Sequence, residues 1–100
     1  MVAARLVKFF FKPGERERGF DELDLVLNKE VRNVRGYRGY VSMFSCDDDN
    51  VAVILTMWED DESFRGSQEL FSSTMKKATR FFERQPEMER HRIDTVHLVK

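Results

Sequence analysis

Trp58, Thr56 and His97 are the residues whose types best suit chemistry on a small molecule. The chain has one tryptophan and two histidines. A tryptophan can stack on an aromatic ligand while its N–H bonds to an acceptor, and Thr56 offers a hydroxyl nearby. His97 alternates in phase with Ile93 and Thr95, so it could serve as a general base facing the packed side of a strand. The structural alternatives are core packing for Trp58 and a hydrogen-bonded structural role for His97.

Other reactive side chains lack the neighbours that catalysis or metal binding requires. Cys46 is the only cysteine, and the carboxylates of Asp47 to Asp49 after it oppose thiolate formation. The His, Cys and carboxylate residues show no metal-ligand spacing, and no glycine-rich loop follows a strand to hold a phosphate. A serine nucleophile at Ser72 would lack a nearby base. We therefore expect no metal and no cofactor.

Two charged residues, Arg5 and Lys8, interrupt an apolar segment near the start of the chain. On a strand they would lie on opposite faces, because successive side chains alternate. Either residue could reach a pocket and hold an anion there. The alternative, which we favour, is that each side chain carries its charge to solvent from the end of the strand.

The composition predicts a soluble globular protein, with a single domain over residues 1–100. Apolar residues make up 41% of the chain and charged residues 35%, with a net charge of −1. That balance argues against a nucleic-acid partner, which requires a basic surface. The longest apolar runs, Phe9 to Phe11 and Val51 to Leu55, fall far short of the ~20 residues that span a bilayer. We expect no membrane association and a cytoplasmic location.

The spacing of apolar residues predicts elements in the order βαββαβ. Strands are expected at residues 3–12, 37–46, 51–58 and 93–99. Amphipathic helices are expected from residue 15 to about 35, and from Asp60 or Asp61 until Pro86 stops the second one, with a break near Gly66 and Ser67. This order usually folds into a four-stranded antiparallel sheet with both helices on one face, the ferredoxin-like α+β fold.

The expected sheet has two apolar faces, although two helices can cover only one of them. Strand 51–58 is apolar on both sides, and strand 3–12 places Phe9 on one side and Phe10 on the other. An uncovered face of this kind would be a large apolar patch, which soluble monomers rarely show. We therefore predict a homodimer that pairs through the sheet face and closes a dimeric α/β barrel.

Three segments carry a resemblance to a known family. They are Lys12-Pro13-Gly14, the segment Arg35 to Tyr40, and Leu55 to Asp60 followed by Phe64. In this order and spacing, over nearly the whole chain, they resemble the antibiotic-biosynthesis-monooxygenase-like family of dimeric α/β barrels. The resemblance implies a ligand pocket between the sheet and the helices of each subunit. The matching pocket positions are Val7, Phe9, Ile54, Thr56, Trp58, Phe64, Ser67 and Phe71.

The chain departs from that family at several positions. The cofactor-free, quinone-forming monooxygenases are similar to it at Trp58, but they carry an asparagine where Ile54 stands and a tyrosine where Phe64 stands. The residues that haem-degrading relatives use are replaced here by Val7, Ser67 and Lys77. The best-known active-site groups of the family are therefore not carried over intact.

The resemblance leaves two functions open. The first is a cofactor-independent monooxygenase that acts on a small aromatic or quinol-type molecule. Trp58 would wall its pocket, and Thr56, Ser67 or His97 would supply the polar groups. The second is a non-catalytic barrel that binds a small ligand or only assembles, and the apolar replacements favour it. An open cavity with a polar group directed inward would favour the enzyme.

Overall fold

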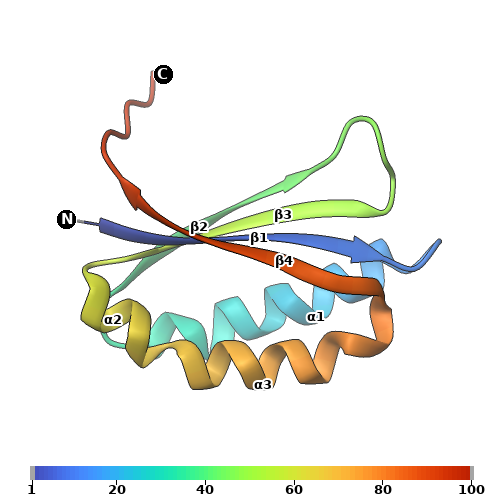
Figure 1. The fold of residues 1–100 in the computed structure, drawn as a ribbon, viewed down its shortest axis with the longest axis horizontal. Coiled ribbons are helices and arrows are strands. Elements are labelled where there is room, and N and C mark those ends of the chain that lie inside the picture. Colours follow the sequence, from blue (N-terminus) through green and yellow to red (C-terminus); the bar gives the residue numbers. More distant parts are fainter. Residues whose placement is uncertain (1, 100) are drawn as a thin grey trace.

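The computed structural model describes residues 2–99, and helices cover one face of its four-stranded sheet (Figure 1). The elements are β1 (Val2–Phe11), α1 (Arg16–Lys29), the 3₁₀ turn η1 (Val31–Asn33), β2 (Tyr37–Phe44), β3 (Val51–Trp58), α2 (Asp61–Gly66), α3 (Gln68–Ala78), the 3₁₀ turn η2 (Thr79–Phe81) and β4 (Phe82–Ile93). The predicted α+β class and βαββαβ order are confirmed. Every helix between residues 2 and 99 is too short or too polar to serve as a transmembrane span.

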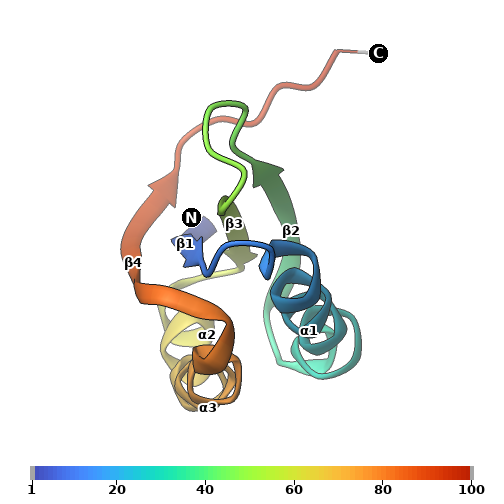
Figure 2. The same ribbon diagram turned by 90° about the vertical axis from the view of Figure 1, so that its right-hand side faces the viewer.

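The sheet has the strand order β2-β3-β1-β4, and each neighbouring pair is antiparallel. The first strand in the chain therefore lies inside the sheet, between β3 and β4. Seen along the strands, α1 and the α2–α3 pair lie side by side against the same face (Figure 2). The space between this face and the helices holds the core and the candidate site.

Alternation along β1 decides which of its side chains enter the core. Val7, Phe9 and Phe11 point to the helices and are buried. The rings of Phe9 and Phe11 lie 6.0 Å apart, and Phe82 at the start of β4 lies 5.7 Å from each of them. This aromatic cluster closes one end of the space between sheet and helices.

The first helix buries the stripe that its spacing predicts. Leu23 and Leu27 are four residues apart, so they share a face, and both are buried against the sheet. The regular helix ends at Lys29, earlier than expected. The apolar spacing continues as far as Val31 because the chain passes into η1, and this 3₁₀ turn keeps Val31 in the core.

The predicted break in the second helix is confirmed. Asp60 caps α2, since its Oδ1 accepts a hydrogen bond from the Ser63 N–H at 2.8 Å. The chain leaves helical pairing at Ser67, whose Oγ donates to the Phe64 carbonyl at 2.6 Å, and α3 begins at the next residue. The break sets α3 along the sheet with its buried side toward β1.

The prediction for the last strand is wrong. The expected helix up to residue 85 ends at Ala78, and strand β4 occupies Phe82–Ile93 instead of residues 93–99. No apolar alternation marks β4 in the sequence, because most of its side chains are charged or polar and exposed. Pro86 lies inside it, where the missing N–H is tolerated because β4 is an edge strand that pairs with β1 alone. Residues 94–99 form no regular structure, so His97 is not on a strand.

The sheet face away from the helices carries an apolar area across three strands. Leu6, Leu55 and Val41 form one row across β1, β3 and β2, because each is the register partner of the next. Val53 and Met43 form part of the next row. Val41 and Met43 are 46% and 47% exposed, and the other three are partly exposed or half-buried. Within residues 2–99 no helix covers this face (Figure 1).

Candidate functional site

A cavity lies between the helix-facing side of the sheet and the helices. It measures about 60 Å³, and its wall is almost entirely apolar. A space of this size holds a few water molecules, since one water needs roughly 10–15 Å³ by the same measure. The lining residues are Arg5, Val7, Phe9, Leu23, Val26, Leu27, Val31, Ile54, Thr56, Trp58, Ser67, Leu70, Phe71, Thr74 and Met75.

Strand register assembles the sheet side of the cavity. Arg5 lies opposite Thr56, and Val7 lies opposite Ile54, in the antiparallel pairing of β1 with β3. Directly opposed residues point to the same face, so these four side chains all project toward the helices. Trp58 extends the same row along β3 and is 1% exposed.

The hydroxyl groups around the cavity are engaged within the protein. Oγ1 of Thr56 accepts a hydrogen bond from the Trp58 indole at 3.1 Å. Ser67 donates to the Phe64 carbonyl, and Thr74 donates to the Leu70 carbonyl at 2.7 Å. These bonds fix the side chains, and they leave no hydroxyl paired with a base that would activate it as a nucleophile.

Arg5 is the cationic residue of the cavity wall, and it is 3% exposed. One guanidinium nitrogen, Nη2, donates to Oε1 of Gln68 at 3.0 Å. The guanidinium carbon lies 4.3 Å from the centre of the Phe64 ring and 4.4 Å from that of Phe71. Burial lowers the pKa of Arg5 to about 10, so the group remains charged at neutral pH. The expectation that Arg5 extends to solvent is wrong, whereas Lys8 is exposed.

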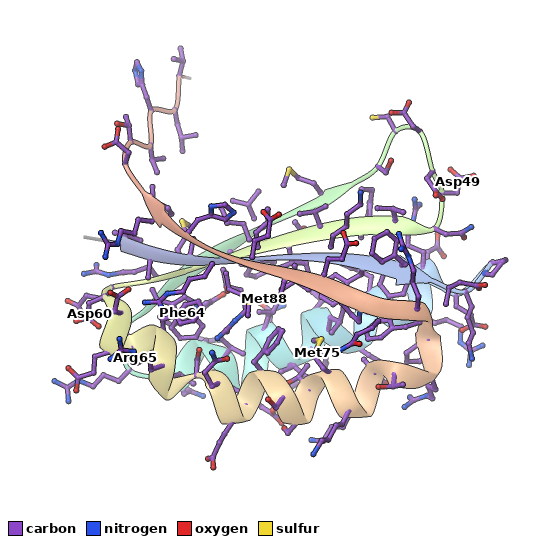
Figure 3. The ribbon with its side chains drawn as sticks, in the orientation of Figure 1. Asp49, Asp60, Phe64, Arg65, Met75 and Met88 are labelled. Carbon is purple, nitrogen blue, oxygen red and sulfur yellow. The ribbon has the colours of Figure 1, made fainter. Side chains whose placement is uncertain are left out.

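A larger groove lies beside the cavity, between α3 and β4. Its volume is about 680 Å³, and it shares Phe71 and Met75 with the cavity wall. Figure 3 shows Met75 rising from α3 and Met88 on β4 in the space between helix and strand. Phe71 and Met75 are half-buried. The cavity and the groove therefore adjoin at these two side chains.

Seven of the eight predicted pocket residues line the cavity: Val7, Phe9, Ile54, Thr56, Trp58, Ser67 and Phe71. The eighth, Phe64, is fully buried beside the cavity (Figure 3). Its ring contacts the guanidinium of Arg5. His97 is exposed in the segment after β4 and does not line the cavity, and His91 is exposed on β4, with Nε2 2.9 Å from Oε1 of Glu89. Of the three catalytic candidates, the fold brings Trp58 and Thr56 together and leaves His97 apart.

The α1 side of the cavity was not predicted from the sequence. Leu23, Val26, Leu27 and Val31 form much of that wall. Their helical spacing marked them as core residues but gave no sign that space remains next to them. Among the described residues, no group of His, Cys, Asp and Glu could hold a metal ion.

Comparison with known proteins places this geometry among related folds. The profile of the family described as antibiotic biosynthesis monooxygenase matches residues 3–91. No curated protein sequence matches the chain. Among solved structures, a conserved protein from Methanosarcina mazei Go1 is 18% identical with a TM-score of 0.76, over 94% of this chain and 95% of that chain.

Two further structures have TM-scores of 0.80. A protein of unknown function from Nitrosomonas europaea is 15% identical, over 99% of this chain and 95% of its own. The monooxygenase from the gene ActVA-Orf6 of Streptomyces coelicolor, solved with the ligand nanaomycin D, is 14% identical over 98% and 92% of the two chains. At these identities the likeness establishes a shared fold.

Proposed function

Because the chain belongs to the antibiotic biosynthesis monooxygenase family, we propose that it is a cofactor-independent monooxygenase acting on a small aromatic or quinol-type molecule. The observation that carries this proposal is the apolar cavity between sheet and helices, with Trp58 on its wall. The nanaomycin D complex of the related Streptomyces coelicolor monooxygenase supports a small ligand for this fold. The cytoplasmic location and the single domain over residues 1–100 stay predictions.

The reaction requires little from the protein beyond placement. In an anthrone-type substrate, one carbon loses two hydrogens and gains one oxygen atom of O₂, and the second oxygen atom leaves as water. The substrate supplies the electrons, so no external reductant is needed. The cavity contributes by orienting the ring and excluding water from it. Trp58 would pack on the ring, with its own N–H engaged by Thr56.

Oxygen uptake with a panel of hydroquinones and anthrones tests the proposal. We expect uptake faster than in buffer for at least one compound, and a fall of about tenfold in Trp58→Phe, because the smaller ring leaves the substrate less well oriented. Arg80→Ala is the control, since Arg80 is exposed and pairs with Glu22 on the helix surface. Uptake at the buffer rate across the whole panel would count against an oxygenase.

A second candidate function is a non-catalytic barrel that binds a small ligand. The engagement of Thr56, Ser67 and Thr74 in bonds within the protein favours it, because none of these hydroxyls faces a base. Under this alternative, aromatic compounds shift the emission of Trp58 while oxygen uptake stays at the buffer rate. The two measurements on the same compounds therefore separate the candidates.

We also propose that the protein forms a homodimer through the outer face of the sheet. The row of Leu6, Leu55 and Val41 supports this, because it continues across three strands with no cover from the chain's own helices. Sedimentation is expected to give twice the chain mass of 11.9 kDa. Leu55→Glu should yield a monomer. Leu25→Glu should not, because Leu25 is 53% exposed on α1, away from this face.

A further inference from the structure

The guanidinium of Arg5 is buried without a negative partner. It takes part in none of the ion pairs found among residues 2–99. Its hydrogen-bond partner Gln68 is neutral, and the two rings beside it carry no net charge. Its Nε, which is inaccessible to solvent, has no hydrogen-bond partner within the described chain. Burying a charge without an opposite charge beside it is unfavourable, because the interior does not replace the water that solvated the charge.

A second arginine at the same aromatic ring shows the contrast. Arg90 on β4 lies 5.2 Å from the centre of the Phe64 ring, on the helix-facing side of the sheet like Arg5. Its Nη2, however, is 3.0 Å from Oδ1 of Asp61, and its side chain is 46% exposed. The charge of Arg90 is thus balanced and hydrated, whereas that of Arg5 is neither. An arginine near the Phe64 ring can thus have a carboxylate partner, and Arg5 lacks one.

We propose that the cavity binds a small aromatic anion, and that the Arg5 guanidinium holds its ionised oxygen. The unpartnered Nε supplies a free donor for a carboxylate or phenolate oxygen. Phe71 and Trp58 supply apolar surface for the ring, and rotation of Phe71 with Met75 opens the groove between α3 and β4 as the access route. This inference rests on the proposed function, because both place the ligand in the same cavity.

Paired ligands of equal shape and different charge test the proposal. Benzoate and benzamide are titrated at constant ionic strength, with calorimetry and the emission of Trp58, the single tryptophan, as readouts. Benzoate should bind at least about tenfold more tightly, because its hydrogen bond to Arg5 is charge-assisted. In Arg5→Met the preference should disappear. In the matched variant Arg90→Met it should persist, because Arg90 lies outside the cavity wall.

Each outcome bears on the proposal. Equal binding of the two ligands to the wild type, or a benzoate preference that survives in Arg5→Met, overturns the anion site but leaves the cavity as a binding site. If neither ligand binds, the anion site is overturned. The proposed function is then still tested separately by oxygen uptake with quinols. If Arg5→Met fails to fold, the wild type alone decides: benzoate should raise its melting temperature more than benzamide does, and the reverse order overturns the proposal.

Discussion

The indole Nε1 of Trp58 donates a hydrogen bond to Oγ1 of Thr56, two residues earlier on β3, at 3.1 Å. The two side chains meet because residues separated by one position on a strand point to the same face. Trp58 is 1% exposed and Thr56 is 8% exposed, so water cannot replace either partner. The bond satisfies the single donor of the indole and fixes its ring at the cavity wall.

Thr56→Val should reveal what this bond contributes. Valine keeps the shape of threonine but leaves the buried indole N–H without an acceptor, so we expect the free energy of unfolding to fall by about 1–3 kcal/mol. Urea denaturation measures the change. Thr74→Val is the control with a smaller expected loss, because the Thr74 hydroxyl bonds to a backbone carbonyl of its own helix. Equal losses in the two variants would contradict a special role for the Trp58 bond.

Gly36 has a backbone that only a residue without a side chain fits. Its φ is +83°, and an added Cβ would lie 1.9 Å from Oγ of Ser63. Gly14 has a similar φ of +79° with nothing within 4 Å of such a Cβ. Gly14→Ala should therefore cost about 1–2 kcal/mol of backbone strain, and Gly36→Ala a further 1–3 or so from overpacking. Chemical denaturation gives the free energy of unfolding of both variants, and the difference between their losses measures the cost of the contact with Ser63. Similar losses in the two variants would show that this contact costs nothing.

The two tyrosines should titrate above their ordinary range. The Tyr40 hydroxyl donates to Oδ1 of Asp24 at 2.5 Å, which raises its pKa, and burial raises the pKa of Tyr37 to about 12. Raised values mean that the stability from these groups is present below pH 10 and is lost as the pH rises through the folded pKa values. Absorbance against pH should show both steps. Asp24→Asn should lower the pKa of Tyr40, because the hydrogen bond to the carboxylate is lost. Normal titration of both tyrosines in the folded wild type would refute the assignment.

Asp60 should contribute stability that acid removes. Its cap bond from the Ser63 N–H lowers its pKa below 3.8, so the stabilising ionised form is present above that value and is lost as the pH falls through the folded pKa. Asp60→Asn keeps a capping side chain but cannot titrate. The wild type should melt at a higher temperature near neutral pH, and the difference should vanish in acid. A constant difference at every pH would show that ionisation of Asp60 has no part in it.

The fold was largely predictable because most elements carry a clear period. Apolar runs located β1 and β3, and the four-residue spacing of Leu23 and Leu27 located α1. Strand β4 escaped because its outer face and much of its inner face meet solvent, so its sequence of charged residues has no apolar alternation. The β-branched segment after it resembled a strand by composition, but residues 94–99 form no regular structure.

The apolar wall of the candidate site could be predicted from the sequence, but the buried charge of Arg5 could not. Seven pocket residues followed from the family resemblance, because that resemblance fixes strand register. The burial of Arg5 could not be read from a single sequence, since an arginine at a strand end usually reaches water. Its position depends on Phe64, Phe71 and Gln68, which belong to helices more than fifty residues later and enclose it only after the chain has folded.

The interior position of β1 has a consequence for synthesis. Ala3 pairs with Trp58 on one side and with Arg92 on the other. Strand β1 is synthesised first, and it can pair only after the middle and the far end of the chain have been synthesised. Such distant pairings form slowly. Until β4 has left the ribosome, a nascent chain presents the open edge of an apolar strand that contains Phe9, Phe10 and Phe11. Chaperones and proteases recognise exposed edges of this kind, so a product truncated before residue 82 should be a substrate for both.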